Sequence, residues 1–289
     1  MTKIKELLDL IRVRQWYKNI VIFLPIFFVT GMSNWNYLYL TAIGFVSLCL
    51  LSSGNYIIND LVDLRKDQLH PEKKNRPLAN GKISKLTAVL LTFLLLALSL
   101  IVGLTLPLEF IFVWIALLTL TQLYTFWLKD ILFADILTIS TLFVLRAVAG
   151  AVAINVKISP WLILCPFFLA LFLAVGKRHS DLILLKGKGI GTRKVLQDYT
   201  VELTNSLMVV STTLLVISYA LYSFLSEHKY LLLTLPFALF TIFRFYHLIQ
   251  GGSDLARNPE KMIRDKSMIL GMLLWIISTT VLIYGAIQW

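Results

Sequence analysis

Charged residues are scarce in this chain. Asp, Glu, Lys and Arg make up 15% of its 289 residues, whereas hydrophobic residues make up 58%. A soluble domain carries about a quarter charged residues, so the composition excludes an ordinary soluble domain. The apolar residues form long continuous runs and do not alternate with polar ones, which favours spanning helices over a membrane barrel. The composition predicts an all-α, polytopic membrane protein.

Cysteine and histidine are also rare, at two and four residues. Cys49 and Cys165 lie within apolar stretches, so we interpret both as small buried hydrophobic residues. His70 and His179 have no partner at metal-ligand spacing. These absences exclude a disulfide framework and a zinc site. They also leave no Cys/His or Ser/His/Asp set for nucleophilic catalysis.

The apolar runs predict nine spans in a single transmembrane domain, residues 1–289. The spans cover residues 18–33, 36–60, 86–106, 108–128, 132–154, 160–177, 203–226, 230–250 and 267–288. The first is short and contains Pro25, which predicts a tilt or a kink. The loops after spans two, six and eight are long and charged, and we expect residues 61–85, 177–202 and 251–266 to cap one face.

Lysine and arginine are distributed unevenly over this topology. Of the 27 such residues, all but four lie in the N-terminal segment and in the loops after spans two, four, six and eight. The positive-inside rule then predicts a protein of the cytoplasmic (inner or plasma) membrane, with a cytoplasmic N-terminus and an external C-terminus. Residues 1–17 are predicted to form an amphipathic helix on the cytoplasmic face, and a simple basic anchor is the equal alternative.

The loop after span two begins with a cluster of acids. Asp60, Asp63 and Asp67 follow helical spacing, which places all three on one face, and Asn59 joins that side. Clustered carboxylates repel each other unless a cation lies among them, and oxygen ligands without Cys or His favour Mg²⁺. We therefore expect Mg²⁺ at this cluster. The alternative is a solvated polar loop, which the spacing along one helix face disfavours.

Basic residues follow the acids at once, among them Lys73 and Arg76. Carboxylates that can bind a metal lie next to basic side chains that can bind phosphate. This arrangement predicts chemistry on a phosphorylated substrate. More polar residues lie at the same ends of other spans, namely Tyr124, Lys129, Asp135, Lys177, Arg178, His179, Asp181, Arg193, Lys194, Asp198 and Tyr199. Any one of them alone is explained as an interfacial side chain that reaches water, but their convergence on one face favours a functional site.

Two further features are less specific. Arg146 follows Asp135 by nearly three helical turns, about 16 Å deeper on the same face. Arginine at that depth is costly, so it either binds an anionic group or makes a structural pair. The glycine-rich residues 186–192 fit neither a P-loop nor a dinucleotide pattern. We interpret them as a loop that either closes over substrate or acts as a linker.

These motifs resemble those of the UbiA prenyltransferase superfamily. The resemblance rests on Asn59-Asp60-x-x-Asp63-x-x-x-Asp67, on Arg76-Pro77-Leu78 with Gly81, and on Tyr124 with Lys129 and Asp135. It extends from Arg14 to Asp265. It implies a UbiA-like fold of nine transmembrane helices around a central cavity, with a polar cytoplasmic mouth and Mg²⁺ bound by aspartate motifs.

The sequence departs from the general family pattern after span six. A second Asp-x-x-x-Asp motif is expected there, but Leu185 stands four residues after Asp181. This region is instead similar to the branch of decaprenyl-phosphate phosphoribosyltransferases. Further segments resemble that branch: Arg14-Gln15-Trp16-x-Lys18-Asn19, Leu145-Arg146-Ala147, Arg193-Lys194-Val195-Leu196 with Tyr199, and Pro259-Glu260 with Asp265.

That resemblance implies transfer of 5-phosphoribose from phosphoribosyl pyrophosphate to a polyprenyl phosphate, with release of pyrophosphate. It implies catalytic roles for Asp63, Asp67 and Asp181, and a Mg²⁺ site made by Asn59, Asp60, Asp63 and Asp67. The residues expected to bind substrate are Arg14, Lys18, Asn19, Lys73, Arg76, Tyr124, Lys129, Asp135, Arg146, Lys177, Arg178, Arg193 and Tyr199. Membrane lipids are the expected surroundings, with no nucleic-acid partner, and homo-oligomer formation is left open.

Two alternatives are weighed against this hypothesis. An aromatic prenyltransferase with a polyprenyl diphosphate donor shares the fold, but its second aspartate pair is missing. A lipid or solute transporter places ionisable groups near the bilayer midplane, whereas here only Arg146 lies that deep and the acids gather at one mouth.

Overall fold

The computed structural model describes residues 2–29, 31–70, 73–185, 194–228, 230–257 and 259–285. These residues form helices, turns and loops without a strand, which confirms the all-α prediction. The chain divides into two compact units. The first unit comprises Met1–Leu162 and Gly189–Val195, and the second comprises Ile163–Lys188 and Leu196–Trp289. The prediction of a single domain, and of three capping loops, stays a prediction.

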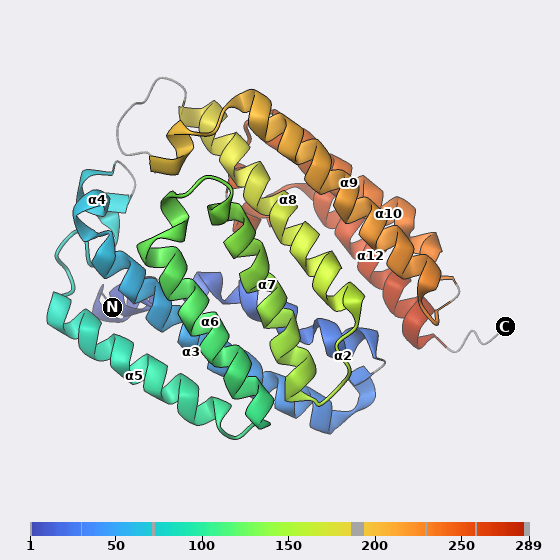
Figure 1. Ribbon diagram of the computed structural model, residues 1–289, viewed down its shortest axis with the longest axis horizontal. Coiled ribbons are helices and arrows are strands. Elements are labelled where there is room, and N and C mark those ends of the chain that lie inside the picture. The colour runs from blue at the N-terminus through green and yellow to red at the C-terminus, as the bar shows by residue number, and fades with distance from the viewer. Residues whose placement is uncertain are drawn as a thin grey trace. The chain divides into compact units, whose positions relative to one another are not determined.

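The first unit is built from seven α-helices and four 3₁₀ segments among the described residues. In chain order they are α1 (Thr2–Leu10), η1 (Val13–Phe23), α2 (Leu24–Phe28), η2 (Gly31–Ser33), α3 (Trp35–Val62), α4 (Leu64–Leu69), η3 (Lys73–Asn75), α5 (Lys85–Gly103), α6 (Leu108–Phe126), η4 (Leu128–Asp130) and α7 (Ala134–Ala153). The long helices α3 and α5 lie side by side, and α6 packs against α7 (Figure 1).

The second unit continues the helical pattern. Its elements are most of α8 (Pro160–Leu185), the end of η5 (Lys194–Gln197), and all of α9 (Val201–Leu225), η6 (Leu231–Thr234), α10 (Leu235–Gln250), α11 (Asp254–Arg257), η7 (Pro259–Arg264) and α12 (Lys266–Tyr284). Gly271 of α12 lies against Phe240 of α10, where a side chain would collide at 2.8 Å. Trp275 Nε1 donates to the Tyr219 hydroxyl at 2.7 Å, which ties α12 to α9.

Side-chain caps set where several of these helices begin. Asn34 accepts the N–H groups of Asn36 and Tyr37 at the start of α3. Ser84, Thr200 and Asp265 cap α5, α9 and α12 in the same way. Each cap satisfies a backbone donor that the first turn leaves without an intrahelical partner, which stabilises a helix by about 1 kcal/mol.

Eight helices in the described part of the chain are long and apolar enough to cross a membrane. The first predicted span, residues 18–33, is the exception, and its prediction as a continuous helix is wrong. The chain there forms η1, α2 and η2 in succession, with Pro25 in the first turn of α2. Proline has no N–H to donate to the preceding turn, so it favours a break here. We call residues 13–33 the broken segment.

The broken segment is packed within the first unit. Asn19, Ile22, Pro25 and Ile26 are buried. Irregular backbone is tolerated at membrane depth only where protein covers it, and α7 provides that cover. A Cβ atom on Gly150 would lie 1.9 Å from the Ile22 carbonyl oxygen. Glycine at this position therefore lets the backbone of η1 lie directly on α7.

The core of the first unit joins α3, α5 and α6. Ser47 and Ser99 exchange hydrogen bonds with each other's backbone carbonyls at 2.8 and 2.7 Å. The indole N–H of Trp114 donates to the Ser99 hydroxyl at 2.8 Å. Phe110 and Leu48 are fully buried beside them. Small hydroxyl residues let α3 and α5 approach closely, and these hydrogen bonds satisfy the buried Ser47, Ser99 and Trp114 donors.

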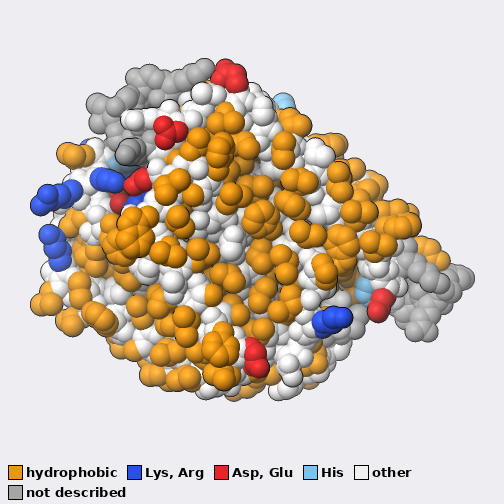
Figure 2. Space-filling view, viewed as in Figure 1, with side chains coloured by type: hydrophobic (Ala, Val, Ile, Leu, Met, Phe, Trp, Pro, Cys, Tyr) orange, Lys and Arg blue, Asp and Glu red, His pale blue; other side chains and the backbone are white. Residues whose placement is uncertain are grey.

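The surface is mostly apolar, as expected for a protein surrounded by lipid. Orange hydrophobic side chains cover most of the face in Figure 2, and Lys and Arg gather over the end of the first unit that carries α4. Leu86, Leu90 and Phe93 of α5 are each more than half exposed. The N-terminal helix ends at Leu10, earlier than the predicted residue 17, because Arg12 adopts a left-handed conformation with φ 52°.

Candidate active site

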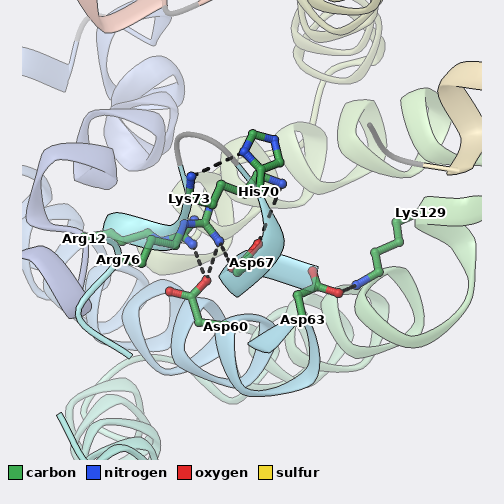
Figure 3. A network of polar contacts seen from close by, with 8 residues as sticks. All are labelled: Arg12, Asp60, Asp63, Asp67, His70, Lys73, Arg76 and Lys129. Carbon is green, nitrogen blue, oxygen red and sulfur yellow. Dashed lines mark hydrogen bonds and ion pairs between the residues drawn. The ribbon is translucent and has the colours of Figure 1, made fainter. Parts of the chain in front are cut away.

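The acidic segment begins as the end of α3 and breaks at Asp63. Helix α3 ends at Val62 and α4 begins at Leu64. The Asp63 N–H donates to the Asn59 carbonyl at 2.9 Å, and the Asp67 N–H donates to the Asp63 carbonyl at 2.8 Å. Both bonds follow the i to i−4 pattern of an α-helix, yet the three carboxylates do not converge on one position. Asp60 and Asp67 point toward one group of cations, and Asp63 points toward another (Figure 3).

The first group is centred on Arg76. Its Nη1 lies 2.9 Å from Asp60 Oδ1 and 2.5 Å from Asp67 Oδ2, so one guanidinium nitrogen joins both carboxylates. Both acids are buried, with 4% of each side chain exposed. Lys73 Nζ lies 3.9 Å from Asp67 Oδ1. Buried carboxylates need such partners because the interior does not solvate their charge.

The second group is an ion pair between Asp63 and Lys129. Lys129 Nζ lies 2.7 Å from Asp63 Oδ1, and the two side chains are 8% and 18% exposed, respectively. Lys129 belongs to η4, the short turn between α6 and α7. The side chain of Asp135 is fully buried in the first turn of α7, and Tyr124 lies in the last turn of α6. The structure thus brings Lys129 to Asp63, whereas the catalytic and substrate-binding roles expected of these residues stay predictions.

Arg12 is a member of this site that the sequence did not single out. Its guanidinium forms a hydrogen-bonded ion pair with Asp60 and lies over the Tyr56 ring, 4.7 Å from the centroid. Its left-handed backbone, uncommon for a residue with a Cβ, turns the chain so that the side chain reaches α3. The neighbouring Arg14, predicted to bind substrate, is exposed.

A divalent ion was predicted at this cluster, and the donor set fits in part. In the described residues, no group of three or more His, Cys, Asp or Glu side chains is arranged to hold a metal. Two carboxylates do converge on one cation position, which Arg76 Nη1 holds. Mg²⁺ commonly takes one or two protein carboxylates and completes its shell with water and substrate phosphates. Asp60 and Asp67 are therefore the pair that fits a metal, whereas Asp63 is engaged by Lys129.

The deep arginine makes the structural pair that was one of its two predicted roles. Arg146 Nε donates to Asn19 Oδ1 at 2.9 Å, and Nη1 donates to the Leu142 carbonyl at 2.7 Å. Asn19 in turn contacts the Cys49 sulfur and the Ser52 hydroxyl, each at 3.3 Å. Beside these groups lies a small polar cavity with room for roughly one water molecule.

Several further predicted residues lie in the second unit. Arg257 Nε donates to Asp181 Oδ1 at 2.8 Å, so the acid predicted to be catalytic is held in an ion pair. Arg178 and Tyr199 are buried, and Lys177 is exposed. Buried His179 contacts the Thr204 hydroxyl at 2.9 Å. The roles predicted for these residues stay predictions, and Arg193 and the loop 186–192 lie outside the described residues.

The carboxyl group of Asp265, in the second unit, has a lowered pKa. The Arg244 guanidinium donates to both oxygens of Asp265, at 3.3 and 2.7 Å. This hydrogen bonding, together with the Met268 N–H that Asp265 caps, lowers the pKa of the Asp265 carboxyl. Asp265 therefore has two structural roles: it forms an ion pair with Arg244 and it caps the start of α12.

Comparison with known proteins agrees with this fold. Residues 20–277 match the UbiA prenyltransferase family. The chain is 32% identical to a decaprenyl-phosphate phosphoribosyltransferase of Mycolicibacterium smegmatis, over 94% of this chain and 91% of that one. A protein of the same name from Corynebacterium glutamicum is also 32% identical, over 95% of this chain and 85% of that one.

A solved structure shares the fold. It is a UbiA homolog from Archaeoglobus fulgidus bound to GPP and Mg²⁺, with a TM-score of 0.72 and 20% identity over 94% of this chain and 99% of that one. The match to the family covers most of the sequence, and the helical architecture agrees with it. This chain belongs to the UbiA prenyltransferase family.

Proposed function

We propose that this protein transfers the 5-phosphoribosyl group of phosphoribosyl pyrophosphate to a polyprenyl phosphate. The names of its curated relatives support this reaction. The structural observation that supports this reaction most directly is the group of carboxylates and cations around Arg76. Two buried carboxylates, with Lys73 and a guanidinium beside them, suit a metal-bound diphosphate.

The chemistry needs no strong base. An oxygen of the acceptor phosphate, already ionised at neutral pH, forms a bond to C1 of the ribose. The bond between C1 and the diphosphate oxygen breaks, and its electron pair leaves with pyrophosphate. No proton has to move, which agrees with a site made of cations and carboxylates. The protein aligns the two anions and neutralises the charge that grows on the leaving group.

Mg²⁺ is the metal we propose, bound by Asp60 and Asp67. The A. fulgidus homolog is described as bound to GPP and Mg²⁺. When bound, the ion supplies charge neutralisation to the diphosphate. The protein's own part is to keep both carboxylates buried and preformed, and to offer Arg76 and Lys73 to the phosphate oxygens. Arg76 then releases the carboxylates of Asp60 and Asp67 and binds the phosphate oxygens of the substrate.

We also propose that this face of the protein lies on the cytoplasmic side of the membrane. The charged loops that follow α3, α8 and α10 carry most of the lysine and arginine. The positive-inside rule places such loops in the cytoplasm. This orientation gives the site direct access to a water-soluble sugar diphosphate while the lipid acceptor stays in the bilayer.

An aromatic prenyltransferase is the second candidate, because a homolog of the same fold is described as bound to a prenyl diphosphate. The experiment supplies purified protein with Mg²⁺ and either ribose-labelled phosphoribosyl pyrophosphate plus polyprenyl phosphate, or a polyprenyl diphosphate plus 4-hydroxybenzoate as the aromatic acceptor. We expect label in the lipid phase from the first pair alone. Prenylated aromatic product, without ribose phosphate on lipid, would overturn the proposal.

A further inference from the structure

A polar stripe runs along α3 below the acidic cluster. It consists of Cys49, Ser52, Ser53, Tyr56 and Asp60, whose spacing places them on one helix face. The chain from Ile11 through the broken segment lies against this stripe. Trp16 Nε1 donates to the Ser53 hydroxyl at 3.0 Å, and the Ser53 hydroxyl donates to the Ile11 carbonyl at 2.8 Å. A polar seam thus leads from the acidic cluster into the first unit.

Tyr56 lies at the centre of three cations on this seam. Arg12 lies over its ring, 4.7 Å from the centroid, and the Lys18 side chain and the charge of Arg146 both act on its hydroxyl. Arg12 is already paired with Asp60. Lys18 and Arg146, by contrast, have no carboxylate within 4 Å among the residues whose placement is described. Arg146 is satisfied by neutral groups alone, the Asn19 amide and the Leu142 carbonyl.

Lys18 and Arg146 are only partly exposed, and cations without a neighbouring acid make an environment that favours an anion. The neighbouring polar cavity, lined in part by Asn19, Ser52, Asn55 and Arg146, holds roughly one water molecule. That space is too small for a phosphate. The outer part of the seam, where Lys18 and Tyr56 meet, is therefore the place for an incoming anion, and Arg146 acts on it through its charge.

We propose that Lys18 and Tyr56 bind the phosphate group of the acceptor lipid, with Arg146 as a positioning residue. This inference rests on the proposed function. Tyr56 precedes Asp60 by one helical turn, about 6 Å along the axis. The donor diphosphate and the acceptor phosphate thereby bind at two adjacent sites that are lined by different side chains. The donor diphosphate is bound by metal and Arg76 among acids, and the acceptor phosphate is bound by cations and a phenol without an acid.

Separate sites for the two phosphate groups avoid electrostatic repulsion between the acceptor and the acidic cluster. An acceptor phosphate placed beside Asp60 and Asp67 would be repelled by both carboxylates and would compete for the metal. At Tyr56 the phenolic O–H donates to one phosphate oxygen and the Lys18 ammonium neutralises another. The acceptor therefore binds in ionised form, which is the form that attacks.

The first experiment is a comparison of kinetic constants. We expect Tyr56→Phe and Lys18→Met to raise the KM for polyprenyl phosphate by about 10-fold to 100-fold, the usual effect of losing a hydrogen bond to a charged group. The KM for phosphoribosyl pyrophosphate is expected to stay within about twofold. Tyr39→Phe and Lys66→Met are matched controls, because Tyr39 is 66% exposed and the Lys66 side chain is 74% exposed.

The second experiment measures binding without turnover. Native mass spectrometry compares retention of a polyprenyl phosphate, the matching polyprenol and phosphatidic acid by the wild type and both variants. We expect the wild type to prefer polyprenyl phosphate over the other two, and each variant to lose that preference. Equal retention of phosphatidic acid would show a general lipid-headgroup site and would overturn the assignment to the acceptor.

The two readouts also separate this inference from the proposed reaction. A wild type that transfers no ribose phosphate but retains polyprenyl phosphate in a Tyr56-dependent and Lys18-dependent manner would refute the reaction and support the site. A wild type that performs the reaction, with variants that keep both the acceptor KM and the lipid preference, would refute the site. Lys18→Met decides the matter if Tyr56→Phe does not fold.

Discussion

Lys129 Nζ lies 2.7 Å from Asp63 Oδ1, although 66 residues separate them in the sequence. The pair joins the end of α3 to the η4 turn that follows α6. It also separates Asp63 from Asp60 and Asp67, whose oxygens meet at Arg76. The acidic cluster is thus divided between one cation position that suits a metal and one ion pair that joins two helices.

Removing Lys129 alone is expected to destabilise the protein. In Lys129→Met the partly buried Asp63 carboxylate loses its partner, which costs about 1–3 kcal/mol of unfolding free energy. The double variant Asp63→Asn with Lys129→Met removes both charges and is expected to regain part of that loss. Unfolding in detergent, followed by tryptophan fluorescence, measures both. Equal stability of wild type and Lys129→Met would show that the pair contributes nothing to the fold.

Asp67→Asn is expected to affect turnover far more than folding. Arg76 keeps its bond to Asp60 in this variant, so the local packing survives. Loss of one of two metal-facing carboxylates is expected to lower kcat by about 100-fold or more. The exposed Asp9 provides the control, as Asp9→Asn removes the same charge from the N-terminal helix. Comparable losses of yield and of kcat would instead assign Asp67 a structural role.

Mg²⁺ is expected to stabilise the wild type and not Asp67→Asn. A ligand present at 100 times its Kd stabilises the folded state by about 2.7 kcal/mol. We expect a rise in unfolding temperature when Mg²⁺ is added to metal-free wild type, together with loss of activity in excess chelator. An identical rise in both proteins would place the ion elsewhere, and full activity in chelator would refute the metal requirement.

Gly150→Ala is expected to disrupt the packing of the broken segment on α7. The added Cβ would lie 1.9 Å from the Ile22 carbonyl oxygen, and backbone on both sides has no room to move. Overpacking of this kind costs about 1–3 kcal/mol. Gly251→Ala is the matched control, since its nearest neighbour would be 3.6 Å away. Thermal unfolding of both variants tests the close approach, and an undisturbed Gly150→Ala would contradict it.

Acid is expected to remove the contribution of Asp265 to stability. Hydrogen bonds from Arg244 and from the Met268 N–H lower the pKa of this carboxyl in the folded state. An unfolded aspartate titrates near pH ~3.9, so the contribution is complete above about pH 5 and is lost as the pH falls through the lower, folded pKa. The difference in unfolding temperature between wild type and Asp265→Asn should shrink accordingly. Asparagine keeps the helix cap, so a difference that is independent of pH would exclude the ion pair as its source.

The positions of the spanning helices followed from local sequence because span length is set by the bilayer. Eight of the nine predicted spans correspond to long apolar helices. The exception, residues 18–33, has the composition of a span but forms the broken segment. Composition reports only how apolar a stretch is, whereas the break depends on Pro25 and on the cover that α7 gives through Gly150.

At the candidate site, too, local sequence predicted some features and tertiary packing decided others. Helical spacing placed Asp60, Asp63 and Asp67 together, but it could not show that Lys129 engages Asp63 while Arg76 joins the other two. Arg12 was missed because its role comes from one left-handed residue that turns the chain back onto α3. Asp181 was predicted from its resemblance to a motif, and its partner Arg257 is 76 residues further along the chain.

The sequence by itself determined that the chain is helical, that it spans a membrane and that acids and bases gather at the ends of its spans. These properties depend on composition and on short-range spacing, which water and lipid select directly. Only the tertiary structure decided which cation neutralises which carboxylate, and which cations are left without an acid. Those choices depend on side chains brought together from distant helices, because a buried charge binds whatever opposite charge packing places beside it.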